Sequence, residues 1–259
     1  MKNASSAAGL FRSLPRFHFR LPLLLLAGAC AIAAATAAAA NTAVEPESRG
    51  TSWENRHKFF VDIASQPKPD CQVLFLGDSI TDFWRDRALG VWEKNFGHYG
   101  AENFGISGDR TQHLLWRLQN GEIGNLRPKV IVLMIGTNNT GFENDKTTRR
   151  NTPAEAAEGV KAVVAYLREK LPDAKILLLA VFPRGEKDDP QRAEVSQIND
   201  IISKLNDGRS VFYLDINKNF LFPDGTLPRD IMPDLLHPSL KGYQIWAAAI
   251  KDPLAKLAK

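Results

Sequence analysis

Short apolar runs that alternate with longer segments of helical periodicity constrain the fold of this chain most strongly. The runs predicted to be strands are Val73–Leu76, Ala101–Phe104, Val130–Ile135, Ile176–Val181 and Val211–Leu214. The third and fourth runs are apolar at nearly every position, which is typical of parallel strands covered by helices on both faces. The segments predicted to be helical are Trp53–Ala64, Thr111–Gln119, Pro153–Leu171, Gln191–Leu205 and Leu240–Leu257. This alternation predicts an α/β fold, a flavodoxin-like three-layer α/β/α sandwich with a five-stranded parallel sheet.

The size and charge of the chain limit its organisation. It has 259 residues, of which 44% are hydrophobic, and this is enough for one sizeable α/β domain. The formal net charge of +4 comes from the first 40 residues, which hold Lys2, Arg12, Arg16 and Arg20 and no acidic residue. The rest of the chain is therefore neutral overall, and it lacks the basic signature of a nucleic-acid-binding protein.

The first 40 residues have the pattern of an export signal. A basic region ends at Arg20, and an apolar stretch runs from Leu21 to about Ala40. Small residues at Ala38 and Ala40 suit cleavage by a signal peptidase near Asn41. The pattern therefore predicts export to the periplasm or the extracellular space.

Two alternatives to a cleaved signal remain open. The apolar stretch is long, so an uncleaved membrane anchor is one alternative, and lipidation at Cys30 is the other. In either case we predict a leader at residues 1–40, a polar and irregular linker at 41–52, and a single folded domain at 53–259. A membrane contact is expected only through an uncleaved leader.

The cysteines and three of the histidines do not predict chemistry. A cleaved protein keeps Cys71 as its single cysteine, and we interpret this residue as a small half-buried side chain rather than a nucleophile. His57, His98 and His113 lack the spacing of metal-ligating residues, so we predict no metal site.

A serine, a histidine and an aspartate stand where a parallel sheet would bring them together. The first strand run stops at Gly77-Asp78-Ser79, and Asp234 and His237 lie three residues apart far downstream. A serine hydroxyl needs an adjacent base, and that base needs an orienting partner. We therefore predict Ser79 as nucleophile, His237 as general base and acid, and Asp234 as the carboxylate that orients the imidazole.

Acyl transfer also needs hydrogen-bond donors for the oxyanion. The candidates are the backbone N–H groups of Ser79 and Gly105 and the side-chain amide of Asn138, all of which follow predicted strands. Asp78 is expected to fix the nucleophile turn by hydrogen bonds. Asp109 and Arg110 are expected to form a local ion pair beside the site.

Four sequence blocks resemble those of the SGNH (GDSL) hydrolase superfamily and occur in the same order. The blocks are Gly77-Asp78-Ser79, Asn103-Phe104-Gly105-Ile106-Ser107-Gly108-Asp109, Gly136-Thr137-Asn138-Asn139 and Asp234-Leu235-Leu236-His237. The resemblance covers about Cys71 to Leu257 and implies the SGNH hydrolase fold with a serine esterase activity.

A narrower resemblance is to the α subunits of intracellular platelet-activating-factor acetylhydrolase and their bacterial relatives. It rests on the segments Leu115–Glu122, Pro128–Val132 and Phe182–Lys187. This subgroup implies small acyl groups, acetyl above all, no metal or organic cofactor, and a homodimer. The chain departs from the animal enzymes in its leader, in Ser107 and Arg110, and in a longer connection at Thr140–Asn151.

The combined expectation is an exported carboxylic ester hydrolase that removes acetyl groups, with O-acetylated carbohydrates as the expected substrates. The alternative within the same class is a phospholipid acyl-ester hydrolase, of the platelet-activating-factor acetylhydrolase or lysophospholipase type. A non-catalytic carbohydrate-binding protein on the same fold is the alternative from another class. That alternative predicts a damaged triad or oxyanion set, and the sequence shows no such damage.

Overall fold

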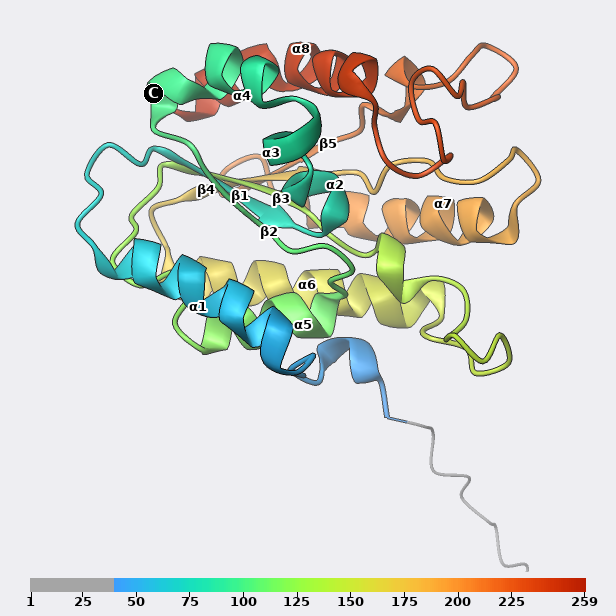
Figure 1. The fold of residues 1–259 in the computed structure, drawn as a ribbon, viewed down its shortest axis with the longest axis horizontal. Coiled ribbons are helices and arrows are strands. Elements are labelled where there is room, and N and C mark those ends of the chain that lie inside the picture. Colours follow the sequence, from blue (N-terminus) through green and yellow to red (C-terminus); the bar gives the residue numbers. More distant parts are fainter. Residues whose placement is uncertain (1–39) are drawn as a thin grey trace, which may run out of the picture. The chain divides into compact units, whose positions relative to one another are not determined.

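The predicted strands form one parallel sheet in the computed structural model, which describes residues 40–259 (Figure 1). The strands are β1 (Val73–Gly77), β2 (Glu102–Gly105), β3 (Val130–Met134), β4 (Lys175–Leu179) and β5 (Val211–Leu214). Their order is β2-β1-β3-β4-β5, and every neighbouring pair is parallel. This is the flavodoxin-like order, so the predicted fold class is confirmed.

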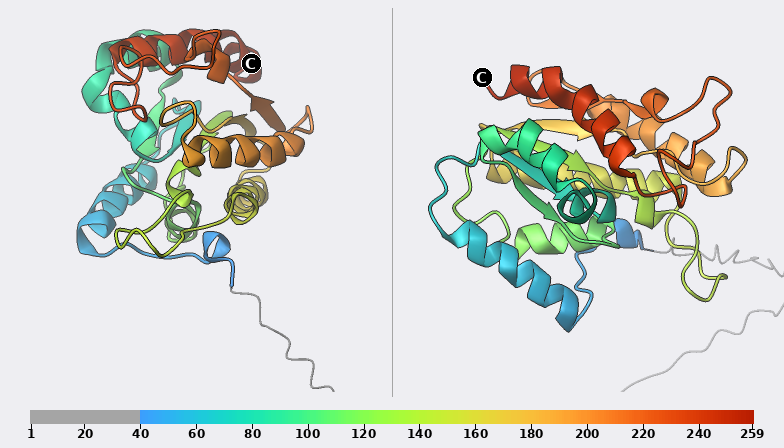
Figure 2. Two further views of the ribbon diagram at one scale, coloured as in Figure 1. Left: turned by 90° about the vertical axis from the view of Figure 1, so that its right-hand side faces the viewer. Right: turned by 45° about the horizontal axis from the view of Figure 1, so that its top comes forward.

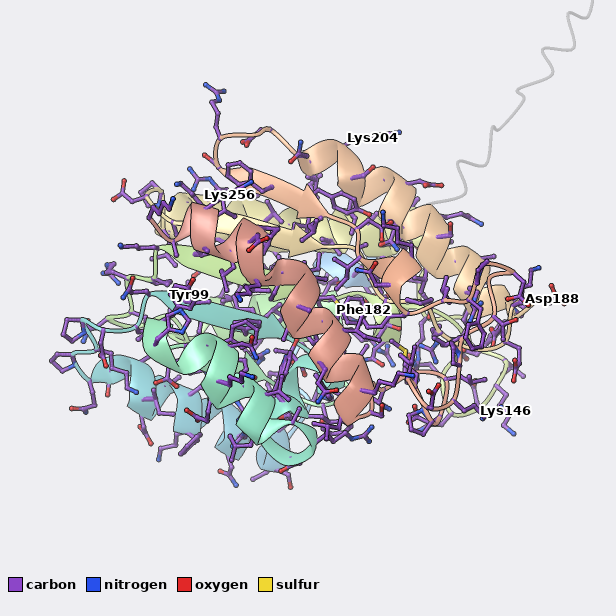
Figure 3. All side chains as sticks on the ribbon, turned by 90° about the horizontal axis from the view of Figure 1, so that it is seen from above. Tyr99, Lys146, Phe182, Asp188, Lys204 and Lys256 are labelled. Atoms are coloured by element: carbon purple, nitrogen blue, oxygen red, sulfur yellow. The ribbon has the colours of Figure 1, made fainter. Side chains whose placement is uncertain are left out.

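Helices cover both faces of the sheet, as the apolar strands require. One layer holds α1 (Thr51–Ser65), α5 (Thr111–Gln119), α6 (Pro153–Lys170) and α7 (Pro190–Ile202), and the other holds α4 (Leu89–Phe96) and α8 (Leu240–Leu257). Figure 1 shows α1, α5 and α6 on one side of the sheet and α4 and α8 on the other, and Figure 3 shows α4 and α8 lying across it. Each layer buries its own apolar cluster against one face of the strands.

Local sequence signals explain the best predicted helices. The bounds of α5 and α8 agree with the prediction, and α6 ends one residue earlier than expected. Thr152 caps α6, accepting a hydrogen bond from the Glu155 N–H, while Glu155 accepts from the Thr152 N–H and Pro153 occupies the first turn. Ser239 caps α8 by accepting from the Gly242 N–H.

Three helices between β1 and β2 were not predicted from the sequence. They are α2 (Ser79–Asp82), α3 (Trp84–Arg87) and α4. Two of them have only four residues, which is too short for a helical pattern to be recognised or for a helix to form alone. Their stability comes from tertiary packing, because the fully buried Trp84 contacts Tyr243 and Trp246 of α8. The short 3₁₀ segments are η1 (Thr42–Val44), η2 (Gly97–Tyr99), η3 (Thr137–Asn139), η4 (Ser203–Leu205) and η5 (Asn217–Asn219).

Residues 41–52 differ from the irregular linker that the sequence suggested. They contain η1, and they pack on the domain through the fully buried Ala43. The carbonyl of Ala43 accepts a hydrogen bond from Thr111 Oγ1, and the Arg49 guanidinium reaches Asp109. The predicted leader, Ala40 apart, lies outside the described residues. Within residues 40–259, no helix combines the length and the apolar character needed to cross a membrane.

Candidate active site

The carboxyl end of β1 places Ser79 at the rim of the sheet. Asp78 directly follows the strand and caps α2, since its Oδ1 accepts a hydrogen bond from the Ile80 N–H at 3.0 Å. Ser79 is therefore the first residue of α2, at the sharp turn between strand and helix. A Cβ atom on Gly77 would collide with Thr81 and with the carbonyl of Met134, so this turn needs glycine. The expected role of Asp78 in fixing the turn agrees with this hydrogen bond.

Ser79, His237 and Asp234 form one hydrogen-bonded row. Ser79 Oγ lies 2.8 Å from His237 Nε2, and His237 Nδ1 lies 2.7 Å from Asp234 Oδ2. An ionised carboxylate only accepts hydrogen bonds, so Nδ1 carries the imidazole proton and Nε2 accepts from the serine hydroxyl. The row joins residues that are 158 positions apart, and it has the geometry of a nucleophile, its base and an orienting acid.

The loop that carries Asp234 and His237 is held by its own hydrogen bonds. Asp234 Oδ1 accepts from the backbone N–H groups of Leu236 at 3.1 Å and His237 at 2.7 Å. Leu235 takes a left-handed backbone conformation (φ 58°), which turns the chain between the two side chains. Partial burial opposes ionisation of Asp234, but the hydrogen bonds from His237 and Leu236 keep its pKa below the ordinary value. The carboxylate is thus charged and oriented before any substrate binds.

Asn138 lies on η3, directly beyond the carboxyl end of β3. Its Nδ2 donates to the Asp109 carbonyl at 2.9 Å, which fixes the amide and leaves its second N–H available. The carbonyl of Asn138 accepts from Arg150 Nη1 at 3.2 Å. β1 and β3 are the neighbouring strands at which the direction of winding of the sheet changes. Ser79 and Asn138 therefore lie at the topological switch point, where α/β folds of this kind bind their ligands. Figure 2 shows this end of the sheet facing the viewer on the left.

Gly105 has a hydrogen-bond partner that the sequence did not suggest. Its N–H donates to Asn103 Oδ1 at 2.9 Å, and Asn103 Nδ2 donates to the Thr81 carbonyl at 2.8 Å. Use of this N–H as an oxyanion donor therefore requires that the substrate share or displace the bond to Asn103. A Cβ atom on Gly105 would also collide with the backbone of Thr81 and Asp82, so close packing against α2 independently explains the glycine.

A buried charge network lies beneath the strand ends. The fully buried Arg117 donates to Asp109 Oδ2 at 2.8 Å through Nε and also pairs with Glu122. Its guanidinium reaches the backbone carbonyls of Phe104 at 3.0 Å and Gly77 at 3.4 Å. Burial alone would lower the pKa of Arg117, but the two carboxylates hold it above the ordinary value. The network therefore ties the ends of β1 and β2 together.

The expected ion pair between Asp109 and Arg110 is wrong. Asp109 Oδ1 accepts from Trp53 Nε1 at 2.7 Å and from Arg49 Nη1 at 3.1 Å, while Arg110 pairs with Glu143 at 2.6 Å. Adjacent residues at the start of a helix point in different directions. Here the Asp109 side chain points inward and the Arg110 side chain points outward. The carboxylate thus completes the buried network, and the arginine lies at the rim.

Asp78 is buried more completely than its capping role requires. Its Oδ2 has no hydrogen-bond partner among the described residues, and its side chain is 1% exposed. The pKa of Asp78 is raised to about 7, mainly by burial and also by the charge of Asp109, while the hydrogen bond from the Ile80 N–H and the charge of Arg184 oppose the rise.

The residues interpreted as non-catalytic occupy structural positions. Cys71 is buried and free, and burial raises the pKa of its thiol to about 11. His57 Nδ1 lies 3.2 Å from Glu122, and His113 Nδ1 accepts from the Arg110 N–H at 3.0 Å. The described part of the chain contains no group of three or more side chains placed to bind a metal ion.

Sequence reasoning missed Arg117, Asn103 and Arg184 as residues that organise this rim. The sequence did contain a signal for Arg117. Its helical spacing places it on the inward face of α5 with Leu114 and Leu118, where a charged residue is unusual. The roles of Asn103 and Arg184 had no such signal, since Asn103 reaches the Thr81 carbonyl in α2 and Arg184 reaches Thr137 in η3.

Comparison with known proteins identifies the family to which this chain is similar. Residues 75–245 match the model of the GDSL-like lipase/acylhydrolase family, which is more than half of the chain. The chain is 38% identical over 206 residues to rat platelet-activating factor acetylhydrolase IB subunit alpha2, covering 79% of this chain and 82% of the relative. It is 34% identical over 206 residues to the human alpha1 subunit, covering 79% and 84%.

Solved structures show the same fold at lower identity. A GDSL-like lipase from Bacteroides thetaiotaomicron superposes with a TM-score of 0.64 at 20% identity, covering 78% of this chain and 97% of the other. An acetylxylan esterase from Geobacillus stearothermophilus superposes with a TM-score of 0.55 at 22% identity, covering 71% and 93%. Both have helices and strands arranged as they are here. Together with the family match and the curated relatives, this places the chain in the GDSL-like lipase/acylhydrolase family as a carboxylic ester hydrolase.

Proposed function

We propose that this protein is an exported acetylesterase that acts through Ser79, His237 and Asp234 and an acyl-enzyme intermediate. The observation that carries the proposal is the continuous hydrogen-bonded row from Ser79 Oγ to Asp234 Oδ2, with contacts of 2.8 Å and 2.7 Å. In this mechanism His237 Nε2 takes the hydroxyl proton as Ser79 Oγ attacks the ester carbonyl. Asp234 stabilises the imidazolium that forms.

The second half of the reaction uses the same groups in reverse. The imidazolium of His237 gives its proton to the departing alkoxide, which leaves the acyl group bonded to Ser79 Oγ. A water molecule then loses a proton to Nε2 and attacks the acyl carbonyl, releasing the acid and the serine. No metal or organic cofactor takes part in the proposed steps.

The oxyanion of each tetrahedral intermediate needs donors on the side opposite His237. The N–H of Ser79 belongs to the first turn of α2, where backbone N–H groups have no partner within the helix. The free N–H of the Asn138 amide is the second donor, and its orientation is fixed by the bond to the Asp109 carbonyl. We propose Gly105 as a third donor, which exchanges its hydrogen bond with Asn103 for one with the substrate.

An acetyl group as the acyl portion is supported by the names of the relatives. The curated homologues are acetylhydrolases, and one structural neighbour is an acetylxylan esterase. We propose O-acetylated carbohydrates as the substrates, because the predicted export leader and the polar connection at 140–151 suit an enzyme that meets external glycans. Asp145, Lys146 and Arg149 are exposed polar residues of that connection.

A phospholipid acetyl ester is the second candidate substrate. It is favoured by the 38% identity to a platelet-activating factor acetylhydrolase subunit and by two exposed phenylalanines on loops after β3 and β5. Phe142 is 50% exposed and Phe222 is 56% exposed, and such side chains suit contact with a lipid as well as with a sugar face. A homodimer is a further proposal, supported by the resemblance to an acetylhydrolase subunit.

Replacing Ser79 by Ala tests the proposed mechanism. Hydrolysis of 4-nitrophenyl acetate should fall by at least about 10³-fold in kcat, and an organophosphonate should label the wild type but not the variant. Ser107→Ala is the matched control, because the Ser107 hydroxyl donates to Asp82 Oδ2 rather than to a histidine. Retained turnover in Ser79→Ala, or equal loss in the control, would refute the mechanism.

The substrate class is tested by acetate release from acetylated xylo-oligosaccharides and from 1-alkyl-2-acetyl-glycerophosphocholine. We expect the sugar ester to have the higher kcat/KM. A higher value for the phospholipid would establish the second candidate instead.

A further inference from the structure

We infer that Arg184 binds a negatively charged group on the alcohol portion of the ester, so that acidic acetyl esters are preferred over neutral ones. This inference rests on the proposed esterase function and names the substrate class of the same site. Arg184 lies in the segment between β4 and α7, at the carboxyl end of the sheet.

Hydrogen bonds place Arg184 between the two halves of the active site. The N–H of Gly185 donates to the Leu235 carbonyl at 2.8 Å, and Leu235 directly follows Asp234. The guanidinium points the other way, because Arg184 Nη1 donates to the carbonyl of Thr137 at 3.1 Å and to its hydroxyl at 3.2 Å. Thr137 directly precedes Asn138, the proposed oxyanion donor. Arg184 is therefore tied both to the triad loop and to η3.

The backbone of this segment is fixed by a second arginine. Arg192 donates to the carbonyls of Arg184 at 3.0 Å, Gly185 at 2.6 Å and Gly225 at 2.7 Å. Gly185 has a φ of +67°, which only glycine adopts readily. The position of Arg184 is thus built by the fold, in contrast to an exposed arginine on a free loop.

The guanidinium of Arg184 still has hydrogen-bond donors available for a ligand. Within residues 40–259 it forms no ion pair, and its hydrogen bonds all come from Nη1, so Nε and Nη2 are free to donate. Asp78 and Asp189 act on Arg184 from beyond ion-pair distance, and their Oδ1 atoms accept from the N–H groups of Ile80 and Gln191. Neither carboxylate therefore neutralises Arg184 by direct contact.

Three arginines near the connection at 140–151 differ from Arg184 in this respect. Arg110 and Arg150 share Glu143, with contacts of 2.6 Å and 3.4 Å, and Arg149 pairs with Glu194 at 2.7 Å. Each of these arginines thus contacts a carboxylate directly, although the three arginines and two glutamates together leave one net positive charge at the outer rim. Arg184 is the half-buried cation that faces the space between η3 and the triad loop without a carboxylate of its own.

The planar fork of a guanidinium suits a carboxylate or a phosphate oxygen. The acyl portion of an acetyl ester carries neither, so the anion must belong to the alcohol. It would be the carboxylate of an acidic sugar or the phosphate of a glycerolipid, two sources with the same recognition chemistry. The experiment therefore needs one matched pair of esters for each source.

The first pair is a mono-O-acetylated methyl glucuronoside and the corresponding methyl glucoside, which differ in one carboxylate. The second pair is 1-alkyl-2-acetyl-glycerol 3-phosphate and the uncharged 1-alkyl-2-acetyl-glycerol. The readout is the ratio of kcat/KM for the anionic ester to that for the neutral ester. We expect this ratio to be about 10–100 in the wild type for at least one pair, since charge-assisted hydrogen bonds contribute at this level.

Two variants of Arg184 and one control test the assignment. Arg184→Met should reduce the ratio to about one, and Arg184→Lys should restore part of it because it keeps the charge without the fork. The ratio corrects for any general loss of activity that follows from the missing bond to Thr137. Arg149→Met removes one positive charge from the same rim and should leave the ratio within about twofold of the wild type.

The outcomes separate this inference from the proposed function. A wild-type enzyme that hydrolyses both members of each pair equally is an esterase without the anion site, and this result overturns the inference alone. An equal fall of the ratio in Arg149→Met and Arg184→Met would also overturn it, because long-range attraction would then suffice. If the wild-type protein hydrolyses neither the four esters nor 4-nitrophenyl acetate, the proposed function itself is refuted.

Discussion

Replacing Arg117 by Met should be among the most damaging single changes in the described domain. Met keeps much of the length and the apolar stem of Arg117 but removes a fully buried guanidinium. Asp109 and Glu122 then lose the positive charge that both contact, and both are 0% exposed. The carbonyls of Phe104 and Gly77 lose a donor at the same time.

The expected loss of stability follows from the carboxylates of Asp109 and Glu122, which stay buried when the guanidinium is removed. Removing one partner of a buried ion pair typically costs about 3–5 kcal/mol, because the remaining charge stays buried without that counterion. Asp109 keeps its contact with Arg49 at 3.1 Å, so the charge left without an arginine partner is that of Glu122. A domain of ordinary stability has about 5–15 kcal/mol in total, so the variant should lose at least about a fifth of it. The ends of β1 and β2 should loosen as well, and kcat should fall even where the variant remains folded.

Urea unfolding followed by tryptophan fluorescence measures this loss. With a urea m-value of about 2–3 kcal/mol/M, the midpoint should fall by about 1–2 M. The double variant Arg117→Met/Glu122→Gln should be more stable than Arg117→Met alone, since it removes the charge left without an arginine partner. Arg149→Met, which breaks a partly exposed pair, should cost no more than about 1 kcal/mol. A loss below about 1 kcal/mol in Arg117→Met would refute the reasoning that this network holds the strand ends.

Two further predictions concern the oxyanion donor and acid stability. Asn138→Ala should lower kcat for 4-nitrophenyl acetate by about 10²–10³-fold with a smaller change in KM, and a fall of less than about threefold would exclude the amide as a donor. Burial lowers the pKa of His113 from 6.5 to about 3, and the positive charges of Arg49 and Arg110 act in the same direction. Stability from neutral His113 is therefore complete above pH 6.5 and is lost towards pH 3, by at most about 1.4 kcal/mol per pH unit. His113→Gln should unfold in urea with a weaker dependence on pH across that range, and an unchanged dependence would contradict the assignment.

The sequence determined those parts of the protein that local physics decides. Continuous apolar runs specify strands covered on both faces, and for this reason Val130–Met134 and Lys175–Leu179 could be located to within two residues. Caps and periodicity set the ends of α5, α6 and α8. The chemistry of Ser79, Asp234 and His237 could likewise be named in advance, because nucleophile, base and acid must be of these residue types.

Tertiary structure alone decided which groups meet. Asp109 pairs with Arg117 and Arg49 rather than with its neighbour Arg110, and this depends on how α5 and the segment before α1 pack beneath the strand ends. The bond from Asn103 to the Thr81 carbonyl, and the position of Arg184 between Thr137 and Leu235, likewise depend on which segments the sheet brings together at one end. Side-chain pairing depends on distance in space, whereas periodicity along the chain reports only which way each element faces the core.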